Sequence, residues 1–137
     1  MLIYFGFTYC PDICPTDLQN IGLALDELEP AGNRVQPLFI TVDPERDTAE
    51  HLKEYVPLFH PRLIGLTGDA AAIRAAADAY KVYYARVWNE RGDDYTVDHT
   101  AFIYLMGVDG NYVGFIPPGT SPERIAETLR KQIALHP

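Results

Sequence analysis

The sequence contains few cysteines and few basic residues, and each shortage excludes a class of protein. Its 137 residues include only two cysteines, too few for a scaffold held together by disulfides. Its 11 lysines and arginines are outnumbered by 19 acidic residues, which gives a formal net charge of -8. Because nucleic-acid binding requires a basic face, we expect no nucleic-acid partner.

Long apolar runs are also missing. No run approaches the roughly 18–20 residues of a membrane-spanning helix, and no charged segment followed by an apolar one marks an export signal. Met1 leads directly into an apolar segment. We therefore expect residues 1–137 to be a single domain that is truncated at its N-terminus, and we expect any membrane attachment to run through a preceding anchor.

Apolar and amphipathic segments alternate along the chain, which predicts an α/β domain. The predicted strands are 2–8, 35–42, 63–67, 82–88, 101–106 and 112–116, and the predicted helices are 15–29, 48–58, 70–80 and 122–135. Residues 89–94 form an expected hairpin-like loop, and an Asp-Gly turn joins the last two strands. This order predicts a mixed central sheet with helices on both faces.

Polar residues at the predicted helix starts are typical of N-caps. Thr16 with Gln19, and Asp47 with Glu50, match the capping-box pattern. Single caps are predicted at Asp69 and Ser121.

Both cysteines lie in one short stretch, where the first strand gives way to the first helix. Cys10 and Cys14 are four residues apart, a spacing that puts both on one face of a helix. A helix N-terminus favours anions, so a thiolate forms there more readily than the ordinary thiol pKa of about 8.5 implies. Three intervening residues give a wider bite than the two usual in dithiol oxidoreductases. The pair is therefore a candidate redox or metal site.

Two thiolates leave a metal ion under-coordinated, and one histidine is the candidate third ligand. His99 lies between Asp98 and Thr100, where a loop enters a predicted strand. A Cys–Cys–His set suits Cu(I), and it takes Cu(II) with an added ligand. Zinc would prefer a fourth protein ligand or an open catalytic position. The other three histidines are interpreted as solvated surface or loop residues, and they are His51, His60 and His136.

Three motifs resemble the Sco/SenC family, and they follow the family order over nearly the whole chain. They are Phe-Gly-Phe-Thr-Tyr-Cys-Pro-Asp-Ile-Cys-Pro at 5–15, Thr-Val-Asp-Pro-Glu-Arg-Asp-Thr at 41–48 and Asp-Tyr-Thr-Val-Asp-His-Thr at 94–100. The resemblance implies a thioredoxin-like fold and a copper metallochaperone. By the motif match, Cys10, Cys14 and His99 take the copper-ligand roles.

The resemblance also implies partners and a location. The copper recipient would be the dinuclear site of cytochrome c oxidase subunit II, and other copper carriers are further expected partners. Relatives are tethered to the periplasmic face of the bacterial inner membrane or to the mitochondrial inner membrane on its intermembrane-space side. Family members begin with an anchor and an N-terminal hairpin that this sequence lacks, so an oligomer could form by pairing at the open edge near Met1.

Two aspartates in these motifs, Asp98 and Asp43, each have two candidate roles. Asp98 either orients His99 as a hydrogen-bond acceptor or caps its loop. Asp43 either lies beside the metal site at the end of a strand or serves only its own turn with Arg46, the role that we favour. Tyr9 and Asp12 flank the thiols and are expected to shape access to them.

The sequence is compatible with two main functions. The first is a metallochaperone without turnover of its own. The alternative is a thiol–disulfide oxidoreductase that keeps the target cysteines reduced, in which Cys10 attacks and Cys14 resolves the mixed disulfide. Both can coexist, because the thiols must be reduced to bind copper. A thiol peroxidase is a third, less favoured function.

Overall fold

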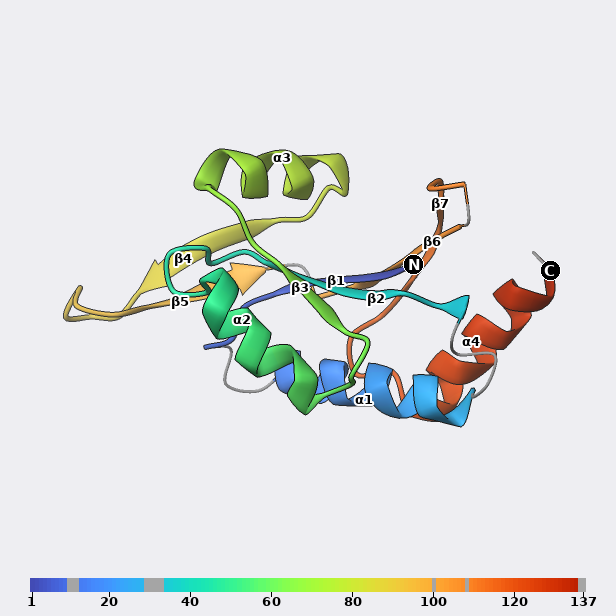
Figure 1. The fold of residues 1–137 in the computed structure, drawn as a ribbon. Helices are drawn as coiled ribbons and strands as arrows, with labels where there is room; N and C mark the ends of the chain where they lie inside the picture. The colour runs from blue at the N-terminus through green and yellow to red at the C-terminus, as the bar shows by residue number, and fades with distance from the viewer. Residues whose placement is uncertain (10–12, 29–33, 100, 108, 136–137) are drawn as a thin grey trace.

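A computed structural model describes residues 1–9, 13–28, 34–99, 101–107 and 109–135 (Figure 1). Within these ranges the strands are β1 Leu2–Gly6, β2 Pro37–Thr41, β3 Ile64–Leu66, β4 Tyr84–Trp88, β5 Tyr95–His99, β6 Ile103–Met106 and β7 Tyr112–Ile116. The helices are α1 Ile13–Glu27, α2 Ala49–Tyr55, α3 Ala70–Ala79 and α4 Pro122–Leu135, with a 3₁₀ turn, η2, at Val56–Leu58. No described helix is both long and apolar enough to cross a membrane.

The described strands form a five-stranded mixed sheet and a separate two-stranded ribbon. The sheet order is β3-β2-β1-β6-β7, in which β1, β2 and β3 are parallel and β6 runs antiparallel to both of its neighbours. All five residues of β1 are buried, as expected for a central strand covered on both faces. The ribbon pairs β4 with β5 across the predicted hairpin loop.

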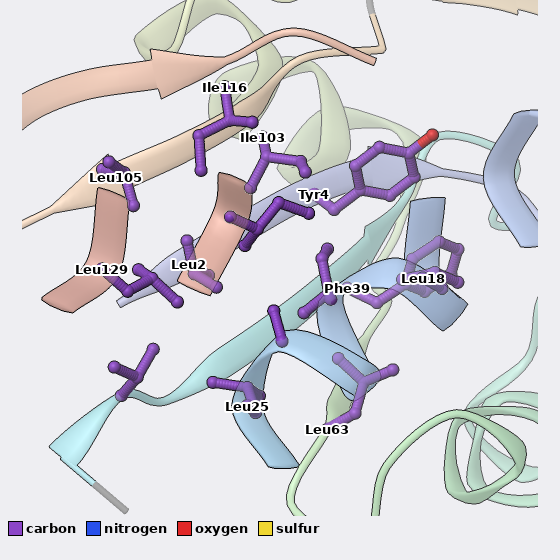
Figure 2. Packing of buried hydrophobic residues seen from close by; sticks show 14 of the residues in the cluster. Leu2, Tyr4, Leu18, Leu25, Phe39, Leu63, Ile103, Leu105, Ile116 and Leu129 are labelled. Atoms are coloured by element: carbon purple, nitrogen blue, oxygen red, sulfur yellow. The ribbon is translucent and has the colours of Figure 1, made fainter. Parts of the chain in front are cut away.

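The two faces of β1 belong to two different cores. Leu2 and Tyr4 belong to one cluster with buried residues of α1 and α4 (Figure 2) and with Leu52 of α2. Ile3 and Phe5 pack on the side of α3. Figure 1 accordingly shows α3 on one side of the sheet and α1 and α4 on the other. The expected mixed sheet with helices on both faces is confirmed.

The first predicted cap is wrong. Helix α1 begins at Ile13, so Thr16 lies inside its first turn rather than before it. Pro15, the predicted first residue of this helix, is its third residue. A proline is tolerated there because the first-turn N–H groups have no partner within the helix.

The second predicted cap is wrong as well, and its neighbour takes the role. The hydroxyl of Thr48 accepts from the backbone N–H of His51 at 3.2 Å, which makes Thr48 the N-cap of α2. Asp47 is fully buried and binds elsewhere. The caps at Asp69 and Ser121 are confirmed by their bonds to the N–H groups of Ala72 and Arg124.

Candidate metal centre

The cysteine motif spans the junction between β1 and α1. Strand β1 ends at Gly6, the chain continues through Thr8 and Tyr9, and α1 begins at Ile13. Cys14 is the second residue of α1, whereas Cys10 and Asp12 lie outside the described residues. The backbone therefore agrees with the expected strand-to-helix junction.

The segment that carries the histidine ends near the same edge of the sheet. His99 is the last residue of β5 and lies opposite Tyr84 in the ribbon, although the side chains of Asp98 and His99 are outside the described parts. Strands β1 and β6 are antiparallel, with Tyr4 opposite Ile103, so the chain entering β6 runs beside the chain leaving β1. His99 precedes Ile103 by four residues, a reach of about 14 Å at most. The topology thus carries both motifs to one edge.

The loop after β2 joins the two motifs by side-chain contacts. Asp43 is buried, and its carboxylate accepts from Nε of Arg46 at 2.5 Å and from the hydroxyl of Tyr95 at 2.6 Å. The bond to Arg46 fits the predicted turn role. The bond to Tyr95, 52 positions away, is a link to β5 that sequence reasoning missed.

Asp47 holds the end of the first strand. Its carboxylate accepts from the backbone N–H of Thr8 at 3.0 Å, from the Thr8 hydroxyl at 2.5 Å and from the Thr41 hydroxyl at 2.6 Å. Three donors satisfy a carboxylate that is fully buried, where an unpaired one would be costly. The residue read as a helix cap therefore fixes the chain two positions before Cys10.

His51 is part of the same network and is half-buried, so it is less solvated than predicted. Its Nε2 lies 2.8 Å from the Thr8 hydroxyl oxygen. Because the single hydroxyl proton of Thr8 goes to Asp47, Nε2 of His51 is the donor in this bond. The imidazole also stacks on Tyr9, with ring centroids 6.0 Å apart and an interplanar angle of 13°.

The prediction of a solvated side chain is wrong for His60. This side chain is 5% exposed, with Nε2 3.2 Å from Asp26 and Nδ1 accepting from the backbone N–H of Arg62 at 3.1 Å. Helix α1 can approach the backbone of Phe59 and His60 because residue 22 is a glycine. An added Cβ there would lie 2.3 Å from the carbonyl oxygen of Phe59. His136 lies outside the described residues.

A pocket of about 440 Å³ opens beside Tyr9, and its lining includes Arg46, Trp88, Asp94 and Tyr95. The Arg46 guanidinium carbon lies 4.6 Å from the ring centroid of Tyr9 and 3.9 Å from that of Tyr95. Burial, the hydrogen bond to Asp43 and the charge of Asp43 raise the pKa of Tyr95 to about 12. Each of these effects disfavours the tyrosinate, so Tyr95 is a neutral donor at physiological pH.

The donor chemistry of the two motifs fits a copper ion. Two thiolates and one imidazole are soft to intermediate ligands, and few in number, as Cu(I) prefers. Among the described residues, no group of three or more histidine, cysteine, aspartate or glutamate side chains could hold a metal ion. The predicted ligand side chains of Cys10, Cys14 and His99 lie outside the described parts of the structure, and the three stay the predicted ligand set.

Comparisons with known proteins agree with the motifs. The model of the SCO1/SenC family matches residues 1–134. The mitochondrial SCO2 homologue of Bos taurus is 46% identical over 136 residues, which cover 98% of this chain and 51% of that protein. An SCO2-like protein of Rickettsia conorii is 45% identical over 132 residues, covering 96% of this chain and 64% of that protein. The chain thus spans about half to two thirds of these relatives.

Solved structures support the same relationship and confirm the thioredoxin-like fold expected from the motifs. Copper-bound ScoI of Arabidopsis thaliana superposes with a TM-score of 0.91 at 43% identity, covering 98% of this chain and 84% of that one. Copper-bound yeast Sco1 gives 0.87 at 41% identity, with 97% and 75% covered. BsSco, described with a disulfide switch, gives 0.67 at 25% identity, with 98% and 80% covered. The chain belongs to the SCO1/SenC family.

Proposed function

We propose that this chain is a copper metallochaperone that acts in the assembly of cytochrome c oxidase. Its cargo is Cu(I), held by the thiolates of Cys10 and Cys14 and by the imidazole of His99. The observation that carries the proposal is the likeness to copper-bound relatives that are more than 40% identical over nearly the whole chain. All three proposed ligands stand in this sequence within motifs that match the family.

The backbone arrangement supports this ligand set. Cys14 lies in the first turn of α1, where the helix dipole favours a thiolate over a thiol. His99 ends β5 close to the edge at which β1 leaves the sheet. An imidazole supplied by a separate ribbon completes a site that two thiolates alone would leave open. Asp98, next to His99, is proposed to accept a hydrogen bond from the imidazole nitrogen that faces away from the metal. Asp43 is proposed not to bind copper and to influence the site only through its contacts with Arg46 and Tyr95.

Copper transfer follows from the low coordination number. An incoming thiolate or imidazole of the recipient adds to the three-coordinate ion, and one of the chain's thiolates then leaves and takes up a proton. No electron moves in this exchange, so Cu(I) stays Cu(I). The proposed recipient is the dinuclear copper site of cytochrome c oxidase subunit II, and other copper carriers are proposed as donors to this chain.

The location is proposed from the relatives. Those compared include mitochondrial and bacterial proteins. We place the functional protein at the periplasmic face of a bacterial inner membrane, or on the intermembrane-space side of the mitochondrial one. Both compartments are more oxidising than the cytosol, which makes the redox state of the two thiols relevant to copper loading.

A thiol–disulfide role is the second candidate, and BsSco favours it because a disulfide switch has been identified in that relative. In this role the Cys10 thiolate attacks a disulfide of the target, and the Cys14 thiolate then releases the reduced target by forming the Cys10–Cys14 disulfide. Two electrons pass from the pair to the target cysteines. The same pair would thus reduce the recipient in one state and load it in another.

The test is a transfer assay. Protein loaded with Cu(I) is mixed with the reduced, metal-free copper domain of subunit II, and copper is measured on each protein after separation. Wild type should deliver its copper. The Cys10→Ser and Cys14→Ser variants should bind little Cu(I) and should therefore deliver little. The control is His136→Ala, which should transfer as wild type does. Wild type that binds no copper, or retains it all, would contradict the metallochaperone function.

A further inference from the structure

We propose that the loop segment 43–47 is a positioning clamp that sets the distance between the two halves of the copper site. The clamp residues are Asp43, Arg46 and Asp47. This inference rests on the proposed function, because it concerns how His99 is presented to the cysteine pair. The clamp residues themselves do not contact copper.

The first arm of the clamp holds the cysteine side. Asp47 binds both the backbone N–H and the hydroxyl of Thr8, at 3.0 and 2.5 Å. It also binds the Thr41 hydroxyl at the end of β2, so the chain leaving β1 is tied to the neighbouring strand. Thr8 lies two residues before Cys10, beyond the last residue of β1. The Asp47 carboxylate thus fixes the chain where the sheet no longer does.

The second arm holds the histidine side. Asp43 accepts from the Tyr95 hydroxyl at 2.6 Å, and Nη1 of Arg46 donates to the Tyr95 backbone carbonyl at 3.1 Å. Tyr95 is the first residue of β5, and His99 is the last. Tyr95 and His99 are the two ends of one five-residue strand, so a shift of Tyr95 displaces the backbone of His99 with it.

Arg46 connects the two arms directly. Its guanidinium lies over the ring of Tyr9, next to Cys10 in sequence, and over the ring of Tyr95. Its Nη2 is buried and has no hydrogen-bond partner among the described residues. The faces of the two rings are therefore the surroundings that hold this part of the cation, by cation–π attraction. The Arg46 side chain thus contacts Tyr9, beside Cys10, and Tyr95, in the strand that ends at His99.

The ribbon needs such a clamp because the main sheet does not hold it. Among the described strands, β4 and β5 pair only with each other. The ribbon also packs on the α3 side through Val97 and Tyr84, and Arg74 of α3 lies 4.2 Å from the ring centroid of Tyr84. Its hydrogen bonds with Asp43 and Arg46, and the 2.7 Å ion pair of Arg86 with Glu45, lead back to loop 43–47. Hydrogen bonds of the main sheet therefore fix β1, whereas loop 43–47 fixes β5 relative to it.

The decisive variant is Tyr95→Phe, which removes one hydroxyl and keeps the ring that contacts Arg46. A hydrogen bond to a carboxylate corresponds to roughly ten- to a hundredfold in an equilibrium constant. We expect the Cu(I) affinity of Tyr95→Phe to fall about tenfold, measured by competition with a chromogenic Cu(I) chelator. The matched control is Tyr112→Phe, which removes an exposed hydroxyl on β7 and should bind as wild type does.

A double-mutant cycle separates positioning from general weakening. If Tyr95 acts through His99, Tyr95→Phe should lower affinity in the wild-type background and change nothing in the His99→Ala background. An equal loss in both backgrounds would overturn the proposal, as would an unchanged affinity of Tyr95→Phe. Arg46→Lys keeps the charge but loses the paired donors to Asp43 and Tyr95. It should behave like Tyr95→Phe, and it serves if that variant fails to fold.

A second readout needs no copper. In the metal-free protein, amide hydrogens of β5 should exchange about tenfold faster in Tyr95→Phe than in wild type, whereas amides of β1 and β6 keep their rates. Tyr112→Phe should leave β5 unchanged. Unchanged β5 exchange in Tyr95→Phe would overturn the clamp. A wild type that binds no Cu(I) would instead remove the proposed function, and the exchange rates would still decide whether the clamp exists.

Discussion

The hydroxyl of Thr8 donates a 2.5 Å hydrogen bond to the carboxylate of Asp47, 39 positions further along the chain. Thr8 lies just past β1, and Asp47 lies in the loop after β2. The bond therefore ties together the ends of two parallel neighbours. It also makes a fully buried carboxylate a structural requirement of the cysteine junction.

Replacing this carboxylate should cost considerable stability. Asp47→Asn puts an amide NH₂ group where at least one of three donors now finds an oxygen, so a buried donor loses its partner. We expect the free energy of unfolding to fall by about 3 kcal/mol. Urea unfolding measures this. The control is Asp78→Asn on the exposed face of α3, which should change stability by less than about 0.5 kcal/mol. Equal effects in the two variants would contradict the role given to Asp47.

Gly22 should be irreplaceable for a different reason. A Cβ at this position would lie 2.3 Å from the carbonyl oxygen of Phe59, a backbone atom that cannot rotate away. Gly22→Ala should therefore lower the free energy of unfolding by about 2 kcal/mol or more, despite the better helix propensity of alanine. Gly114→Ala is the control, since a Cβ there meets nothing within 4 Å. A Gly22→Ala protein as stable as wild type would show that α1 does not pack this closely.

The raised pKa of Tyr95 predicts a loss of stability in alkali. Its folded pKa of about 12 lies above the ordinary tyrosine pKa of 10.0, so the folded state holds the phenol proton more tightly. The stabilisation is fully present below pH 10 and is lost as the pH rises from 10 towards 12. Unfolding experiments over this range should show a steeper decline for wild type than for Tyr95→Phe. Parallel declines would contradict the link between Tyr95 and Asp43.

Oxidation of the cysteine pair should abolish copper binding. A Cys10–Cys14 disulfide has no thiolate to offer, so the oxidised protein should bind no Cu(I), and reduction should restore one copper per chain. Copper is measured after gel filtration together with a free-thiol assay. Copper retained by fully oxidised protein would rule out the cysteines as ligands.

Local sequence signals predicted the elements of the fold well. Alternating apolar and amphipathic segments indicated the strands of the main sheet and the four α-helices. The caps at Asp69 and Ser121 are predictable from the sequence, because an N-cap side chain binds an N–H group only three residues away. Such contacts depend on near neighbours in the sequence, where pattern reasoning is strongest.

The errors arose where distant partners decided a side chain's role. Asp47 looked like a cap, but its partners Thr8 and Thr41 become available only once β1 and β2 pair. His60 looked solvated, yet the approach of α1 over Gly22 buries it. The link from Asp43 to Tyr95 has no signal in a single sequence, because the two residues are 52 positions apart. The candidate ligands were identifiable from their motifs, but the loop that we propose to position them was not.

The most direct test of the account is the Cu(I) affinity of His99→Ala beside that of wild type, with His136→Ala as the control histidine. Competition against a chromogenic Cu(I) chelator gives all three values under one set of reducing conditions. The three-ligand site predicts one Cu(I) per wild-type chain, an affinity lower by about tenfold or more in His99→Ala, and no change in His136→Ala. An unchanged affinity of His99→Ala would contradict the three-ligand site.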